Sequence, residues 1–142
     1  MICPGPCCMT EADRRLYYVR ADRTEARAQA LLLNMLNETQ RHTYYRFRRF
    51  QVQGSHGTLY RIHTAGYSGN VYWLRPSGRS GGQFCGHSDY DRGANLMLPA
   101  SDHYLAQMLS LVADEISWLN VACLQDGDYP PSWHFAVKGE VS

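Results

Sequence analysis

The sequence lacks the features that mark membrane proteins and secreted proteins. Its longest apolar stretch, around Leu31–Leu33, is far shorter than the roughly 20 residues that a membrane-spanning helix requires. Near the start, Pro4, Gly5 and Pro6 occupy the place where a signal peptide carries its apolar run, so no secretion signal is readable. We therefore expect a cytoplasmic protein that has no membrane partner.

Signatures of catalysis are also missing. No glycine-rich run has the phosphate-loop pattern, and no two histidines have the spacing of metal ligands. Asp114 with Glu115, and Asp89 with Asp91, are close acidic pairs that lack the second carboxylate position of a hydrolase, and we expect both pairs to face solvent. The expectation is a non-enzymatic protein without an obligatory cofactor.

The cysteines allow several interpretations. Their number is odd and no secretion signal accompanies them, which argues against a complete disulfide framework. Cys85 and His87 are two residues apart, so on a strand both side chains would leave the same face and could share a metal ion. Cys3 with Cys7 or Cys8 would complete a tetrahedral zinc site, although paired C-x2-C knuckles are absent. A zinc site, a disulfide that involves the N-terminal cysteines and unlinked thiols stay open.

Charge is present but unevenly distributed. The net charge is +1, yet residues 1–75 carry eleven arginines against five acidic residues, and the remainder carries three basic against eight acidic residues. Such a split is typical of two halves that attract each other, within one chain or between copies, or of an anionic partner at the basic half. We favour self-complementarity.

Apolar periodicity in this chain of 142 residues predicts a single domain with three helices. Two pairs of residues have the spacing of a capping box, Asp22 with Glu25 and Asn37 with Gln40, and each pair marks a helix start. The expected helices are Arg23–Leu36, a second helix after Asn37 that extends through Phe47, and Ala100–Ala122. Between them, alternation predicts short strands at Phe50–Val52, Tyr60–Ile62, Val71–Trp73 and, as a fourth, Gln83–Cys85.

These elements predict an α+β fold of the order α-α-β-β-β(β)-α, in which the helices cover one face of a small antiparallel meander of three or four strands. We expect residues 1–21 to be an N-terminal extension, 22–123 the domain and 124–142 an aromatic tail that starts with a turn at Gln125–Asp128. Tyr129, Trp133 and Phe135 carry too much apolar area to stay undocked, so they are candidate partner-binding residues. We favour another subunit over the same chain as the surface they contact.

The remaining candidate site combines arginines with aromatic rings. Arginines can neutralise phosphates and exposed rings can stack on bases, as in proteins that hold single-stranded nucleic acid. The candidate nucleic-acid-binding residues are Arg41, Arg46, Arg48, Arg49 and Arg61, interleaved with Tyr44, Tyr45, Tyr60, Tyr72 and Trp73.

A series of short motifs between residues 26 and 122 resembles an uncharacterised small domain family of hypothetical proteins in bacteriophage and bacterial genomes. The motifs are Ala28-Gln29-Ala30-Leu31-Leu32, Gln40-Arg41, Tyr60-Arg61-Ile62, Gly69-Asn70-Val71, Cys85-Gly86-His87, Leu98-Pro99, Asp102, Leu105-Ala106-Gln107 and Asp114-Glu115.

The resemblance implies a phage or prophage accessory protein made in a bacterial host, either an interaction protein or a virion component. The implied partners are other protein subunits, namely copies of itself or phage structural proteins. The alternatives are a nucleic-acid-binding accessory protein that uses the second helix and a small zinc-binding module.

Overall fold

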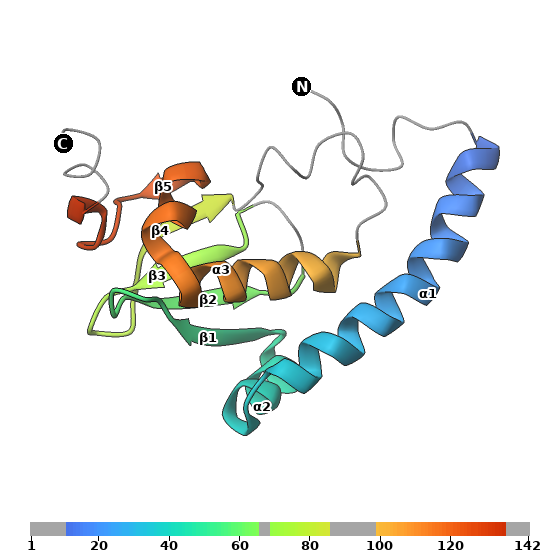
Figure 1. Ribbon diagram of the computed structural model, residues 1–142, viewed down its shortest axis with the longest axis horizontal. Helices are drawn as coiled ribbons and strands as arrows, with labels where there is room; N and C mark the ends of the chain where they lie inside the picture. Colours follow the sequence, from blue (N-terminus) through green and yellow to red (C-terminus); the bar gives the residue numbers. More distant parts are fainter. Residues whose placement is uncertain (1–10, 66–68, 86–98, 136–142) are drawn as a thin grey trace.

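Three helices and five strands make up the described part of the chain (Figure 1). The computed structural model describes residues 11–65, 69–85 and 99–135, with side chains from residue 23 onward. The elements in chain order are α1 (Glu11–Met35), α2 (Glu38–Phe47), β1 (Arg49–Gln53), β2 (Leu59–His63), β3 (Val71–Leu74), β4 (Ser80–Cys85), α3 (Ala100–Val121) and β5 (Cys123–Gly127). The predicted α+β class is confirmed.

The first helix is longer than the sequence predicted. It begins at Glu11 rather than Arg23, so part of the segment expected as an N-terminal extension is helical. Glu25, which the sequence assigned to a capping box, lies inside the helix, and its carboxylate accepts hydrogen bonds from the N–H and hydroxyl of Ser101 at 2.8 and 2.5 Å. Ser101 is in the first turn of α3, whose N-cap Pro99 makes no side-chain bond. Glu25 therefore stabilises the start of α3 and not that of α1.

The capping box at the second helix is confirmed. Asn37 Oδ1 accepts from the Gln40 N–H at 2.8 Å, and Gln40 Oε1 accepts from the Asn37 N–H at 2.9 Å. The Gln40 side chain also donates to the carbonyl of Gln51 at 2.6 Å, which holds α2 against β1. Arg48 ends the helix in the left-handed region at φ 57°.

The strands form one antiparallel sheet in the order β1-β2-β3-β4-β5. The four predicted strands are confirmed, but the turn predicted at Gln125–Asp128 is wrong, because a fifth strand pairs with β4 there. Leu124 lies opposite Phe84, and the Asp128 N–H donates to the Gly81 carbonyl at 2.9 Å. Long-range pairing of this kind outweighs local turn composition. The segment expected as a tail therefore starts as a strand of the sheet.

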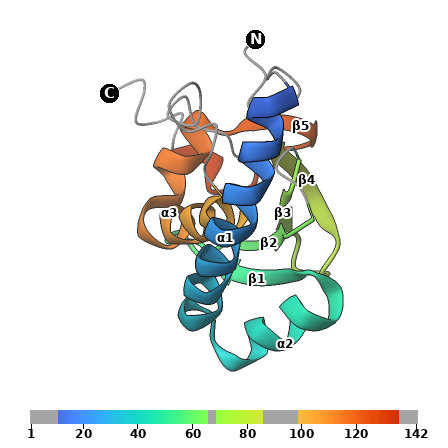
Figure 2. The same ribbon diagram turned by 90° about the vertical axis from the view of Figure 1, so that its right-hand side faces the viewer.

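The helices are not equivalent in how they meet the sheet. α3 lies across β1 and β2, α1 packs mainly on α3, and α2 packs against β1. Figure 2 shows this arrangement, with α1 crossing α3 and α2 beside β1. The sequence predicted that all three helices cover one face of the sheet, whereas in the structure only α3 lies across it.

Cross-strand register gathers the core on one face of the sheet. Phe50, Ile62, Val71 and Phe84 form one buried row, and Val52, Tyr60 and Trp73 form the next. From α3, the Trp118 ring meets the rings of Phe84 and Tyr60, with centroids 5.4 and 6.0 Å apart. Alternation along each strand leaves the other side chains on the opposite face.

A break divides α3, which the sequence predicted as continuous. Asp114 has the non-helical angles φ −160° and ψ 83°, and its carboxylate accepts from the N–H and hydroxyl of Ser117 at 3.1 and 2.7 Å. These bonds cap the second segment and lower the pKa of Asp114. The β1–β2 turn docks at the break, because the Ser55 N–H donates to the Leu111 carbonyl at 3.0 Å and Ser55 Oγ accepts from the Glu115 N–H at 2.9 Å.

Glu115 is fully buried at this junction, in contrast to the solvent-facing position expected from sequence. Its Oε1 accepts from the His56 N–H at 2.6 Å, and its Oε2 accepts from the hydroxyls of Tyr60 at 2.5 Å and Ser132 at 2.7 Å. Burial and this carboxylate raise the pKa of Tyr60 well above its usual value. A Cβ at Gly54 would lie 2.5 Å from Oε1, so glycine is needed for the close approach.

The aromatic tail packs on its own domain. The rings of Tyr129 and Trp133 stack with centroids 4.2 Å apart, and Tyr129 also meets Phe84 at 5.7 Å. Tyr129 and Trp133 are partly buried against the core, and the neighbouring Ser132 hydroxyl donates to the buried Glu115 carboxylate; a partner-binding role for these two rings stays a prediction. Phe135 is 53% exposed, and a partner role for it stays a prediction.

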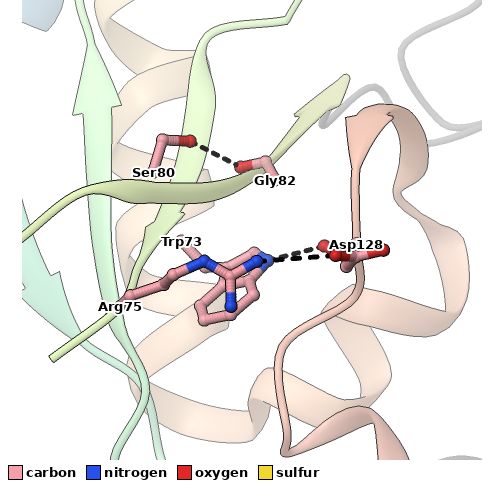
Figure 3. Close-up of polar contacts among 5 residues, drawn as sticks. All are labelled: Trp73, Arg75, Ser80, Gly82 and Asp128. Atoms are coloured by element: carbon pink, nitrogen blue, oxygen red, sulfur yellow. Dashed lines mark hydrogen bonds and ion pairs between the residues drawn. The ribbon is translucent and has the colours of Figure 1, made fainter. Parts of the chain in front are cut away.

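The approach to the tail is fixed at Asp128. Trp73 Nε1 donates to the Asp128 carbonyl at 2.6 Å, and the Arg75 guanidinium lies 3.4 Å from the Asp128 carboxylate. Figure 3 shows the Trp73 side chain of β3 and the Arg75 side chain of the following turn, both directed toward Asp128. The Trp73 side chain that donates this bond is buried, whereas the Arg75–Asp128 ion pair is exposed and contributes little.

We predict that Glu115→Ala lowers the free energy of unfolding by about 3–5 kcal/mol, because two buried hydroxyl donors and one partly buried N–H lose their acceptor. Urea unfolding followed by circular dichroism measures this change. Glu115→Gln should cost less, since the amide keeps an acceptor oxygen. The neighbouring Asp114→Ala, which removes only an exposed cap, should cost about 0.5–2 kcal/mol. Equal losses in the Glu115→Ala and Asp114→Ala variants would contradict this account.

Deletion of residues 128–142 should lower the free energy of unfolding by roughly 2–4 kcal/mol, because the ring contacts of Tyr129 and the Ser132 hydrogen bond disappear. Deletion of residues 136–142 is the matched control and should leave stability unchanged. Thermal melting and size-exclusion chromatography separate the outcomes. Unchanged melting combined with loss of an oligomer would assign the tail to a partner subunit instead.

Candidate functional site

The face of the sheet opposite the core presents polar and aromatic side chains. Register aligns Gln51, Arg61, Tyr72 and Gln83 in one row across β1 to β4. Beside this row, Arg49 of β1 lies opposite His63 of β2. The alternation that buries Tyr60 and Ile62 therefore places the cations of β1 and β2 together on the other face.

The side chains in this region contact one another. Arg61 Nε donates to His63 Nε2 at 3.0 Å, and its guanidinium carbon lies 5.5 Å from the centre of the Tyr72 ring. The His63 and Tyr72 rings meet edge to face at 4.8 Å. At the β1 edge, the half-exposed Phe47 ring has the guanidinium of Arg49 at 5.4 Å and that of Arg46 at 5.5 Å. We call these residues the basic–aromatic surface: Arg46, Phe47, Arg49, Arg61, His63 and Tyr72.

Like charges on the basic–aromatic surface perturb one another. Burial, Arg61 and Arg49 lower the pKa of His63, so the imidazole is neutral at pH 7 and its Nε2 can accept from Arg61. Burial and Arg49 also lower the pKa of Arg61. Within the described ranges no carboxylate forms an ion pair with Arg49 or Arg61, whereas Arg75 pairs with Asp128. Negative charge from outside the chain would relieve this repulsion.

The five arginines predicted from sequence do not act together. Arg41 donates to the carbonyls of Leu33 and Leu36 at 3.3 and 2.6 Å, so it satisfies the C-terminal end of α1. Arg48 lies beside the Tyr44 ring at 6.0 Å. The other three, Arg46, Arg49 and Arg61, belong to the basic–aromatic surface.

Sequence reasoning missed Phe47 and His63 as members of this surface. From sequence, His63 has no metal-ligand spacing to another histidine, and Phe47 only marks the end of the predicted second helix. The available signal was the alternation along β2, because a residue two positions after Arg61 must leave the strand on the same side.

A second candidate is a polar hollow of about 360 Å³ where α1, α2 and the start of α3 meet. Its polar groups are largely used within the chain: Glu25 binds Ser101, and Gln29 donates to the Tyr44 hydroxyl at 2.7 Å. Burial and Glu25 raise the pKa of the neighbouring Asp102. Since these partners are already satisfied, the hollow is a weaker candidate than the basic–aromatic surface.

The predicted metal site stays a prediction. Cys3, Cys7 and His87 lie outside the described residues, and Cys85 is described with a free thiol. Among residues whose placement is described, no three His, Cys, Asp or Glu side chains gather as metal ligands would. In the same part of the chain, no helix is long and apolar enough to cross a membrane.

Comparisons with family models, curated proteins and solved structures found no match to this chain. The resemblance to a phage and bacterial domain family therefore stays a prediction. The argument for function comes from the geometry of the site.

We predict that Arg61→Gln raises the pKa of His63 toward its ordinary value of 6.5, because the nearest like charge is removed. Arg49→Gln should raise it less, and Arg79→Gln, on an exposed turn, should leave it unchanged. Titration of the imidazole resonances by NMR measures the three values. An unchanged pKa in Arg61→Gln would show that burial alone sets it.

The same shift gives a pH dependence of stability. The folded-state pKa of His63 is lower than its unfolded value, so the unfolded chain binds more protons between the two values. His63 should therefore reduce stability as the pH falls below about 6.5. His63→Gln should remove this part of the acid destabilisation in urea unfolding measured from pH 7 to pH 5.

Proposed function

We propose that this protein is a non-enzymatic binding protein that holds single-stranded nucleic acid on the outer face of its sheet. The observation that carries the proposal is the basic–aromatic surface, where Arg49 and Arg61 lie with aromatic rings and without a carboxylate partner in the described part of the chain. A polyanion supplies the negative charge that this surface lacks.

The proposed binding combines two kinds of contact, one with phosphates and one with bases. The guanidinium groups of Arg46, Arg49 and Arg61 are suited to phosphates, since each presents several N–H donors in a planar fork. The rings of Phe47 and Tyr72 offer surfaces on which bases can stack. Because bases in a duplex are already stacked on each other, this combination favours a single strand over a duplex.

The path across the sheet suits an extended strand. β1, β2 and β3 are neighbours and lie about 4.8 Å apart, so the line from Arg49 through Arg61 to Tyr72 covers about 10 Å of a continuous face. Phe47 and Arg46 extend this line beyond the edge of β1. Cations and aromatic rings both occur along this line, as contact with the phosphates and bases of one strand requires.

The accessory-protein and virion-component interpretations concern biological setting and stay predictions. So does the zinc-binding module. A protein that binds nucleic acid in a phage or bacterial cell is compatible with the first of these interpretations.

Binding to a fluorescent single-stranded oligonucleotide should weaken linearly with salt on a log–log plot. The double variant Arg49→Ala, Arg61→Ala should reduce the slope by about 1.4, because two phosphate contacts at about 0.7 each are lost. The control Arg27→Ala, Arg79→Ala removes two exposed arginines elsewhere and should keep the slope. Fluorescence anisotropy measures both. An equal effect of the control, or no binding at low salt, would refute the proposal.

The contribution of the aromatic rings to binding can be measured separately from that of the arginines. Tyr72→Leu should weaken binding by roughly 5- to 100-fold and leave the salt slope unchanged, because base stacking is lost while phosphate contacts remain. Tyr45→Leu, which alters an exposed ring outside the basic–aromatic surface, is the control. A duplex of the same length should bind more weakly than the single strand.

A further inference from the structure

Two cysteines face each other across neighbouring strands. β4 ends at Cys85, β5 begins at Cys123, and the antiparallel register pairs these residues directly. Both thiols are free, with Cys85 partly buried and Cys123 exposed. The preceding pair, Phe84 with Leu124, faces the core, so the cysteines lie on the outer face of the sheet.

The backbone spacing of such a pair suits a disulfide. Directly opposite residues of antiparallel strands have Cα atoms about 4.5–5.5 Å apart, and disulfides join Cα atoms about 4.4–6.8 Å apart. Their Cβ atoms leave the sheet on the same side and are themselves neighbours. Rotation of the two side chains about χ1 therefore brings the Sγ atoms together without movement of the strands.

We propose that Cys85 and Cys123 form an oxidisable dithiol, which a low-molecular-weight disulfide of the glutathione type converts into a cross-strand disulfide. The exposure of Cys123 makes it the first thiol to react, and Cys85 resolves the intermediate. The pairing is independent of the nucleic-acid proposal and involves no residue of the basic–aromatic surface.

The reaction is a pair of thiol–disulfide exchanges. The Cys123 thiolate attacks one sulfur of oxidised glutathione, which forms a mixed disulfide and releases one glutathione thiolate. The Cys85 thiolate then attacks Sγ of Cys123, forms the protein disulfide and releases the second glutathione thiolate. The two protons from the cysteines end on the two glutathione thiols, and two electrons pass from the protein to glutathione.

The disulfide would close a covalent ring that contains all of α3. The ring runs from the end of β4 at Cys85 to the start of β5 at Cys123, with α3 (Ala100–Val121) between them. Closing a loop of this size restricts the unfolded chain more than the folded one, whose strands are already paired. Oxidation should therefore stabilise the attachment of β5, and with it the docked tail.

The test uses the wild-type chain, equilibrated with oxidised glutathione, alkylated under denaturing conditions and digested with trypsin. Cys85 lies on the tryptic peptide 80–92, Cys123 on 93–138, and Cys3, Cys7 and Cys8 on 1–14. We expect mass spectrometry to find 80–92 linked to 93–138, with the link lost after reduction. Linkage of either peptide to 1–14, or stable glutathione adducts on separate peptides, would overturn the proposal.

Thermal melting gives an independent check. Oxidation should raise the Tm of the wild-type chain by roughly 5–10 °C, as expected for a ring of this length. Cys123→Ser and Cys85→Ser should each abolish the rise, while the triple variant Cys3→Ser, Cys7→Ser, Cys8→Ser should keep it. A rise that persists in Cys123→Ser, or no rise in a chain shown to carry the link, would contradict the stabilising role.

Discussion

The arrangement of the chain depends on the hydrogen bonds that the buried carboxylate of Glu115 accepts. A charged group without water needs donors, and here they come from three separate segments: the β1–β2 turn through His56, β2 through Tyr60 and the C-terminal segment through Ser132. Each segment loses a hydrogen bond to this carboxylate if it moves, and the bonds from Tyr60 and Ser132 are buried. One side chain of α3 therefore joins the hairpin, the sheet and the tail.

The break at Asp114 makes this junction possible. In a continuous helix the Leu111 carbonyl and the Glu115 N–H would bond to each other, whereas here Ser55 satisfies both groups. The hairpin turn thus replaces one helical hydrogen bond with two of its own. With the turn fixed, the register of β1 and β2 is fixed as well, and alternation then determines that Arg49, Arg61 and His63 face outward.

Local patterns in the sequence were sufficient to predict the presence of the three helices and of β1 to β4, but not the start of α1. Apolar spacing and the Asn37–Gln40 capping box are properties of neighbouring residues, so they can be recognised without the fold. The break in α3 could not be predicted, because Val112, Ile116 and Leu119 continue the apolar helical spacing across Asp114.

Features that depend on contacts between residues far apart in the chain could not be predicted from the sequence. β5 has the composition of a turn and becomes a strand only because β4 offers an edge. Glu115 was assigned to the surface because its donors lie far away in the chain. The pairing of Cys85 with Cys123 depends on the same β4–β5 register. Within the candidate site, Arg46, Arg49 and Arg61 were predicted, but their separation from Arg41 and Arg48 required the structure.

The uneven distribution of charge along the chain helps to explain the basic character of the outer face of the sheet. Self-complementary halves would use their charges in ion pairs, yet the ion pair found in the described part of the chain is Arg75 with Asp128, and both side chains are exposed. An exposed pair of this kind contributes little to folding. Burial and the proximity of like charges on β1 and β2 instead lower the pKa of Arg61 and that of His63. This arrangement leaves positive charge on the outer face of the sheet, which is why we propose an external anion as its partner.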